Sequence, residues 1–183
     1  MVQKSVALLC NPQDEFILDL IPVLRKEGWQ VHVFCHEQAP SSIKTKATIH
    51  RLPVSVKYPL TYLSFTASFF RLLFLRPQVV HAHGISSYGV YTALMRRFFR
   101  IKPLVMSFTG PDLLDEGSKG MTGWAVRHTI HMADRLLAKS DLRETLIKMG
   151  AKESHLVEQS RDLSQVSLLY LSLLRKRASY KGP

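Results

Sequence analysis

Acidic residues are absent from a long central part of this chain. None occurs from Gln38 to Pro111, whereas ten basic residues lie there, and the whole chain of 183 residues has a formal net charge of +11. A positive field concentrated in one segment attracts anionic partners such as lipid headgroups, nucleic acid or phosphorylated small molecules. The basic residues of this segment are Lys44, Lys46, Arg51, Lys57, Arg71, Arg76, Arg96, Arg97, Arg100 and Lys102.

Cysteines and long apolar runs are also scarce. Cys10 and Cys35 are the only cysteines, too few for a secreted disulfide framework, so we expect buried free thiols in a reducing compartment. No apolar stretch with a cleavage site opens the chain, which favours the cytoplasm. Between Lys57 and Arg71 lie 13 uncharged residues, whereas a membrane span needs about 20. We therefore expect no membrane-spanning helix in that segment.

Several motifs that define enzyme classes are missing. No G-x-G-x-x-G follows the first predicted strand, and there is no P-loop, zinc-type cysteine spacing or G-x-S-x-G elbow. Asp14 and Glu15 open the first predicted helix, where they suit the helix dipole but would repel a phosphate. The length also excludes a two-domain cleft enzyme within this chain, since such an enzyme needs roughly 250 to 400 residues.

Short apolar runs alternate with helix-like stretches, which is typical of βαβ units and a parallel sheet. We predict a single three-layer, Rossmann-like α/β domain over residues 1–158, with a mainly parallel sheet of about six or seven strands. Residues 159–183 are predicted to form a linker remnant and a C-terminal amphipathic helix that packs on this domain. The predicted strands are Ser5–Cys10, Val31–Cys35, Thr48–Val54, Val79–His83, Leu104–Phe108, Arg135–Lys139 and His155–Glu158, and the predicted helices are Asp14–Glu27, Leu60–Leu75, Ser86–Arg100, Thr122–Ala133, Leu142–Met149 and Leu163–Arg177.

Two histidines end the fourth predicted strand, where open parallel sheets place ligands. His81 and His83 face the same side of a strand and could chelate a metal, but no third ligand lies nearby in sequence, so we expect neither a metal nor a cofactor. Either one histidine packs in the core while the other is hydrogen-bonded in a loop, or His83 contacts a substrate. The loop that starts at Thr109-Gly110-Pro111-Asp112 is equally consistent with substrate contact and with an ordinary turn.

Three segments stand out in order along the chain: Val79–Gly84 (VVHAHG), Lys102–Leu113 (KPLVMSFTGPDL) and Ala133–Ser140 (ADRLLAKS). Together they resemble the N-terminal domain of GT4-type glycosyltransferases of the GT-B fold, which typically shows "DVVHAHG", "PLVVTxHGxD" and "ADRVIAVS". Family members have two facing Rossmann-like domains. The acceptor lies mostly on the N-terminal one, and the nucleotide-sugar is held mostly by the C-terminal one. The resemblance extends from about residue 5 to about residue 164.

The resemblance implies roles for particular residues. His83 matches the histidine that faces the interdomain cleft, and Asp112 matches the acid of the "HGxD" loop, so both are candidate catalytic residues. Gly84, Thr109 and Gly110 are candidate substrate-binding residues. The sequence departs from the family in three places: the glycine-rich first turn is Asn11-Pro12-Gln13, the "HGxD" histidine is Thr109, and the "IPNGVD" segment is the degenerate Val157–Asp162.

The resemblance leads to two hypotheses. The first is a glycosyltransferase half, the acceptor side, that needs a separate donor-binding chain for sugar transfer at the membrane surface and is inactive in isolation. The alternative is a non-catalytic binding or scaffold subunit. Nucleic-acid binding is disfavoured because no recognition module accompanies the charge.

The basic segment suggests where a membrane would be contacted. We expect a peripheral site on the inner face of an anionic membrane, formed by Lys57, Arg71, Arg76, Arg96 and Arg97. Within the predicted aromatic helix, most of Leu63, Phe70 and Phe74 are expected to be buried against the sheet, with residual exposed aromatics beside the basic residues.

Overall fold

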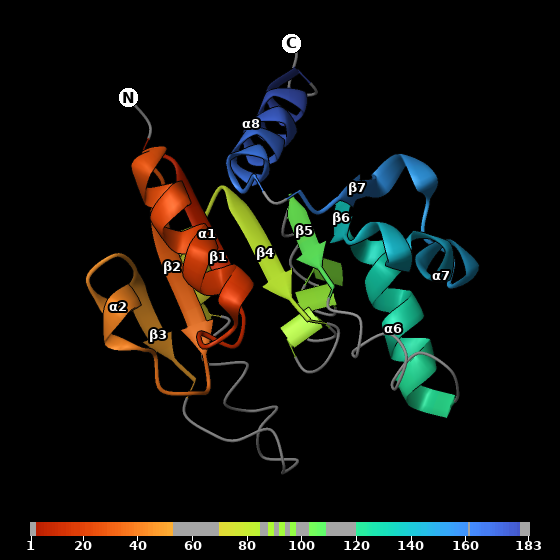
Figure 1. Cartoon of the computed structure of the whole chain (residues 1–183), viewed down its shortest axis with the longest axis horizontal. Coiled ribbons are helices and arrows are strands. Elements are labelled where there is room, and N and C mark those ends of the chain that lie inside the picture. The colour runs from red at the N-terminus through yellow and green to blue at the C-terminus, as the bar shows by residue number, and fades with distance from the viewer. Residues whose placement is uncertain are drawn as a thin grey trace.

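In the part of the chain that the structure describes, seven short strands alternate with helices, as the apolar pattern predicts (Figure 1). The computed structural model describes residues 3–52, 70–84, 88–89, 92–93, 96–97, 103–108, 120–160 and 162–179. The strands are β1 (Ser5–Leu9), β2 (Gln30–Cys35), β3 (Thr48–Arg51), β4 (Val79–His83), β5 (Leu104–Ser107), β6 (Arg135–Ala138) and β7 (Leu156–Glu158). The helices are α1 (Glu15–Lys26), α2 (Ser41–Lys44), α6 (Gly120–Met132), α7 (Arg143–Lys148) and α8 (Ser164–Ser179), with 3₁₀ turns at Ser140–Leu142 and Glu153–His155.

The strands form one parallel sheet in the order β3-β2-β1-β4-β5-β6-β7. The predicted parallel Rossmann-like domain is thus confirmed. The chain winds outward in one direction from β1 to β3 and in the other from β4 to β7, so β1 and β4 are neighbours. In open parallel sheets, ligands bind outside the carboxyl ends of such a pair, because the connections that follow the two strands leave to opposite sides. The end of β1 and the end of β4 therefore define the first place to look for a site.

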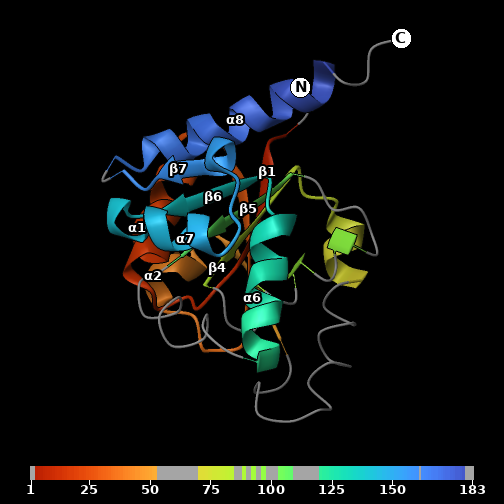
Figure 2. The same cartoon turned by 90° about the vertical axis from the view of Figure 1, so that its right-hand side faces the viewer.

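Successive residues of the strands point to opposite faces of the sheet, and helices cover both. One face carries Val6, Val79, Val105 and Leu137, packed against apolar residues of α1 and α8. The other carries the alternate strand residues, packed against Leu72 of the helical residues 70–75, against Val126 and Ile130 of α6, and against Leu146 of α7. Figure 2 shows α1 and α8 on one side of the sheet and α6 on the other. The three-layer prediction is confirmed.

The predicted tail helix packs on the domain. Val166, Tyr170 and Leu173 of α8 are buried in the same cluster as β1, β4 and β5 residues. A buried hydrogen bond from Trp29 Nε1 to Ser167 Oγ, 2.9 Å long, joins α8 to the segment before β2. None of the helices in the described part of the chain could cross a bilayer, since none is both long and apolar enough.

One difference from the sequence prediction concerns a connection. The short helix α2 was not predicted, because four residues are too few to display a period. Most of the predicted helices Leu60–Leu75 and Ser86–Arg100 lies outside the described residues. The described end of the first is helical over residues 70–75 and stops, as predicted, before Pro77, with Arg76 in the left-handed conformation at φ 45°.

Candidate functional site

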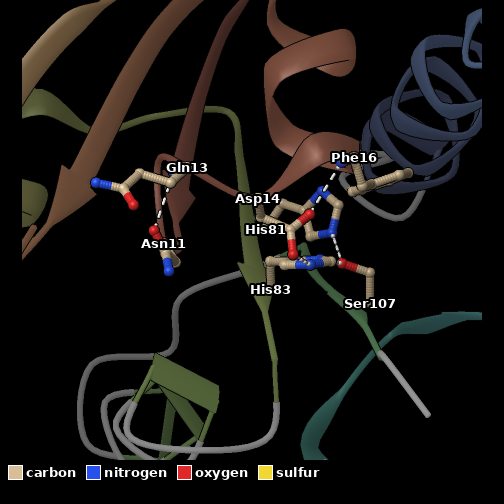
Figure 3. Close-up of polar contacts among 7 residues, drawn as sticks. All are labelled: Asn11, Gln13, Asp14, Phe16, His81, His83 and Ser107. Carbon is tan, nitrogen blue, oxygen red and sulfur yellow. Dashed lines mark hydrogen bonds and ion pairs between the residues drawn. The ribbon is translucent and has the colours of Figure 1, made fainter. Parts of the chain in front are cut away.

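A cluster of polar side chains lies at the carboxyl edge of the sheet, where β1 and β4 are adjacent (Figure 3). His83 is the last residue of β4, and Asp14 caps the N-terminus of α1, which follows β1. The Asp14 Oδ1 atom accepts the backbone N–H of Phe16 at 2.9 Å, and the Oδ2 atom lies 3.2 Å from His83 Nε2. Aspartate is a preferred N-cap residue because its carboxylate accepts an otherwise unpaired amide. Helix capping thus positions the carboxylate beside the histidine.

A line of hydrogen bonds extends inward from this contact. His83 Nδ1 lies 2.5 Å from Ser107 Oγ on β5, and the same Oγ lies 2.8 Å from His81 Nε2. His81 Nδ1 in turn lies 2.5 Å from the hydroxyl of Tyr170 on α8. His81, Ser107 and Tyr170 are at most 1% exposed, and His83 is 5% exposed. From His83 Nδ1 inward, the polar groups therefore pair with one another between the sheet and its covering helices, while His83 Nε2 has the Asp14 carboxylate as its neighbour.

Burial and the neighbouring groups set the charges along this line. Burial lowers the pKa of His81 to about 3, with a further contribution from His83, so the His81 imidazole is neutral. Burial raises the pKa of Tyr170, which keeps its phenol protonated. The hydrogen bond from His83 lowers the pKa of Asp14 in spite of partial burial, so its carboxylate is ionised. Only the outer end of the line therefore has a permanent negative charge.

The geometry excludes two kinds of chemistry among the described residues. Ser107 lies beside a histidine and an aspartate, but it is completely buried between two imidazoles and no substrate could reach it as a nucleophile. Within the described part of the chain, no three His, Cys, Asp or Glu side chains are grouped as metal ligands. The arrangement is suited to hydrogen bonding of a ligand at the sheet edge.

The turn between β1 and α1 leaves little room for a phosphate. Asn11 Oδ1 accepts the backbone N–H of Gln13 at 2.9 Å, and Asp14 takes the N–H of Phe16. Amides that bind phosphate at a helix N-terminus must be free, and the site must lack negative charge. Here the amides of Gln13 and Phe16 are already paired and the Asp14 carboxylate is ionised.

Of the predicted catalytic and substrate-binding residues, the structure describes His83 and Gly84. Gly84 follows β4 with φ 87°, a conformation that favours glycine, and its N–H bonds to the Ser107 carbonyl at 2.9 Å. Thr109, Gly110 and Asp112 lie outside the described residues. Sequence reasoning missed the pairing of His83 with Asp14, and it also missed Ser107 and Tyr170. The first could have been inferred from an aspartate in N-cap position after β1, once β1 and β4 are taken as neighbours.

The predicted anion-contact residues are in different situations. Arg71, Arg76 and Arg97 are exposed, while Lys57 lies outside the described residues. Arg96 is only 12% exposed and holds Asp134 with two hydrogen bonds of 2.7 and 2.8 Å, so its charge is paired within the fold. The expectation that Phe70 and Phe74 are mostly buried is wrong, since they are 54% and 85% exposed. The described end of this helix buries Leu72 instead and turns its aromatic residues outward.

Solved structures with this fold are larger proteins. A UDP-GlcNAc 2-epimerase from Neisseria meningitidis bound to UDP-GlcNAc superposes with a TM-score of 0.66 at 14% identity, covering 95% of this chain and 52% of that one. The Methanocaldococcus jannaschii UDP-GlcNAc 2-epimerase gives 0.59 at 17% identity, with 94% and 49% covered. A glycosyltransferase from Rickettsia africae gives 0.57 at 10% identity, with 86% and 43% covered. The present chain thus spans about half the length of these proteins.

Sequence comparison identifies the family. No curated protein sequence matches this chain. The sequence profile described as glycosyl transferase 4-like matches residues 5–140, which include β1 to β6 and the segments that carry the GT4-type resemblance. The chain therefore belongs to the glycosyl transferase 4-like family.

Proposed function

We propose that this chain is the acceptor-side half of a GT-B glycosyltransferase and transfers sugar only together with a separate donor-binding chain at a membrane surface. The observation that carries the proposal is the position of His83, Gly84 and Asp14 at the β1–β4 edge of a family-typical domain. A cleft enzyme of this fold needs a second domain opposite that edge to hold both reactants in register. This chain spans about half of the similar solved structures.

The donor is the part that a second chain would supply. The Neisseria structure contains UDP-GlcNAc, so a nucleotide-sugar is the substrate class we propose for the complete site. On this chain the ionised Asp14 carboxylate and the occupied amides of the β1–α1 turn oppose binding of its phosphates. The hydroxyl groups of an acceptor carry no charge and suit the same edge better.

Calorimetric titration of the isolated chain with a panel of UDP-, GDP- and ADP-sugars tests whether this chain leaves donor binding to a second chain. We expect affinities no tighter than about millimolar, which corresponds to about −4 kcal/mol, and no sugar transfer. Adding the donor-binding chain should restore transfer. Submicromolar affinity for any nucleotide-sugar by this chain alone would contradict the proposal.

A specific observation favours the alternative of a non-catalytic binding or scaffold subunit. His83 Nδ1 is hydrogen-bonded to Ser107, the Asp14 carboxylate lies 3.2 Å from Nε2, and Phe16 stacks on the ring with centroids 5.2 Å apart, so groups of the same chain surround this histidine. Purification of the native complex and identification of its subunits separates the two functions. A partner with a nucleotide-sugar domain, active after reconstitution, supports the glycosyltransferase half, and a complex without one supports the scaffold.

We propose that the membrane contact involves residues 70–76. Phe70 and Phe74 are exposed beside Arg71 and Arg76, and aromatic rings with neighbouring cations suit the interface of an anionic bilayer. We propose the cytoplasmic leaflet as the place of action, because Cys10 and Cys35 are free and buried, as expected for a reducing compartment.

Sedimentation with neutral and anionic vesicles tests this contact. We expect binding only to anionic vesicles, weakened at least about thirtyfold by the double variant Arg71→Glu/Arg76→Glu, since each nearby cation contributes about 1 kcal/mol. Higher ionic strength should weaken it too. The control Lys139→Glu/Lys152→Glu changes the net charge equally at exposed positions elsewhere and should bind like the unaltered chain. Equal loss in both variants would refute a localised contact.

A further inference from the structure

The line of side chains from Asp14 to Tyr170 joins elements that are far apart in sequence. It starts at the N-cap of α1, passes His83 on β4, Ser107 on β5 and His81 on β4, and ends on α8. Its first four members are drawn in Figure 3. Residues of β4 two positions apart face the same side of the sheet, which is why both histidines can reach one serine. The proposed function uses only the outer end of this line.

The line has a direction, which the donors and acceptors decide. A neutral imidazole has one N–H and one acceptor nitrogen, a hydroxyl can donate one hydrogen, and an ionised carboxylate only accepts. The Asp14 Oδ2 atom lies 3.2 Å from His83 Nε2, so a His83 ring with a single hydrogen places it on Nε2, which leaves Nδ1 to accept from Ser107. The Ser107 oxygen must then accept from His81 Nε2–H, and His81 Nδ1 must accept from the Tyr170 hydroxyl.

We propose that Asp14 fixes the tautomers of both His81 and His83, and that Ser107 and Tyr170 are positioning residues that couple the site at the sheet edge to helix α8. The inference deepens the proposed function, and what it implies for ligand binding rests on that function. The order of the hydrogen bonds is nevertheless a property of the chain by itself.

This order determines what His83 offers to a ligand. Its Nδ1 lone pair is taken by Ser107, so the group directed to the edge is Nε2–H, a donor. A ligand that reaches His83 would do so with an acceptor oxygen, such as that of a sugar hydroxyl, competing with Asp14 for this N–H. In this tautomer His83 is a hydrogen-bond donor at the site and has no free nitrogen to act as a base.

Replacing Asp14, the acceptor at the outer end, should reverse the direction of every hydrogen bond in the line. In Asp14→Asn the side-chain oxygen still caps Phe16, which keeps α1 intact because asparagine is an equally good N-cap. The amide NH₂ then faces His83 Nε2 and donates to it. His83 must carry its hydrogen on Nδ1, Ser107 must donate to His81 Nε2, and His81 must change to the Nδ1–H form.

Two-bond ¹H–¹⁵N spectra of the labelled full chain measure these tautomers. We expect Nε2–H at both histidines in the unaltered chain and Nδ1–H at both in Asp14→Asn. The matched control Glu15→Gln neutralises the neighbouring exposed carboxylate, which is outside the line, and should leave both tautomers unchanged. In Ser107→Ala the connection is cut, so adding Asp14→Asn should no longer alter His81.

Two results would overturn the proposal. One is Nδ1–H at either histidine of the unaltered chain at neutral pH, a test that needs no variant to fold. The other is an unchanged His81 tautomer in a folded Asp14→Asn protein. The spectra are recorded without nucleotide-sugar, donor chain or membrane, so they test the tautomers alone. Absence of sugar transfer would refute the proposed function and leave the tautomer result intact. Unexpected tautomers would refute this inference and leave the proposed function intact.

Discussion

Acidification from pH 7 to pH 4.5 is expected to lower the free energy of unfolding steeply. Burial lowers the pKa of His81 to about 3, whereas an unfolded histidine titrates near 6.5. Below pH 6.5 the unfolded chain therefore binds a proton that the folded chain does not, so stability is lost as the pH falls. His81 alone accounts for roughly 2–3 kcal/mol at pH 4.5.

A second pair of histidines acts in the same direction. His32 Nδ1 and His50 Nε2 lie 3.1 Å apart on β2 and β3, and both side chains are buried. Burial lowers the pKa of His50 to about 4, helped by His32 and Arg71, and burial also lowers the pKa of His32. The pair adds to the loss below pH 6.5 because burial disfavours a proton on either ring, and His32 and Arg71 also repel a proton on His50.

Denaturant titrations between pH 7.5 and 4.5 measure this dependence. His81→Gln removes one titrating group, so its stability should change less with pH than that of the unaltered chain. The control His131→Gln replaces an exposed histidine on α6 and should keep the original dependence. A free energy of unfolding that is flat between pH 6.5 and 4.5 would disprove the account.

Asp134→Ala should destabilise the fold by about 2–4 kcal/mol. Asp134 stands between α6 and β6, where it holds the Arg96 guanidinium with two bonds and also accepts the backbone N–H of Leu104 at 2.8 Å. Its removal leaves a largely buried cation and an unpaired amide at the start of β5. The carboxylate also lines an open cavity of about 480 Å³ with Arg135, His155, Lys176 and other residues. Because the Asp134 side chain is 28% exposed, the loss should be smaller than for a fully buried pair.

Equilibrium unfolding monitored by circular dichroism gives the free energies for this comparison. The matched control is Glu153→Ala, which breaks the exposed ion pair of Arg143 and Glu153, whose side chains are 53% and 70% exposed. Exposed pairs contribute at most about 1 kcal/mol, so this variant should be nearly as stable as the unaltered chain. Similar losses in the two variants would mean that Asp134 has no special structural role.

The sequence predicted the sheet well because each strand has a local signal. The run Val79–His83 is apolar, β-branched in part and fully buried, and the structure gives it the same bounds. Strand ends agree less well, since Cys10 and Phe108 look like strand residues but lie just beyond the ladder. The predicted burial of Phe74 was wrong because helical periodicity does not reveal which side of a helix meets the sheet. Leu72 occupies the core there instead.

The site could be predicted only in part. His83 was found because it ends an apolar strand and resembles a family motif. Its contacts with Asp14 and Ser107 depend on β1, β4 and β5 being neighbours in the sheet, which periodicity along one strand cannot specify. Tyr170 looked like one more apolar residue of an amphipathic helix, and only its position over His81 gives its hydroxyl a role.

The covering of one sheet face by α8 has a consequence for how the chain folds during synthesis. All seven strands precede α8 in the chain, so they leave the ribosome before the helix that packs on Val79, Val105 and Leu137. At about 5–20 residues per second, the part of this face that α8 covers, and the side of His81 that meets Tyr170, stay uncovered for roughly a second after β7 has been made. During that interval the nascent chain exposes an apolar sheet surface that chaperones recognise, and folding is completed only when Tyr170 arrives.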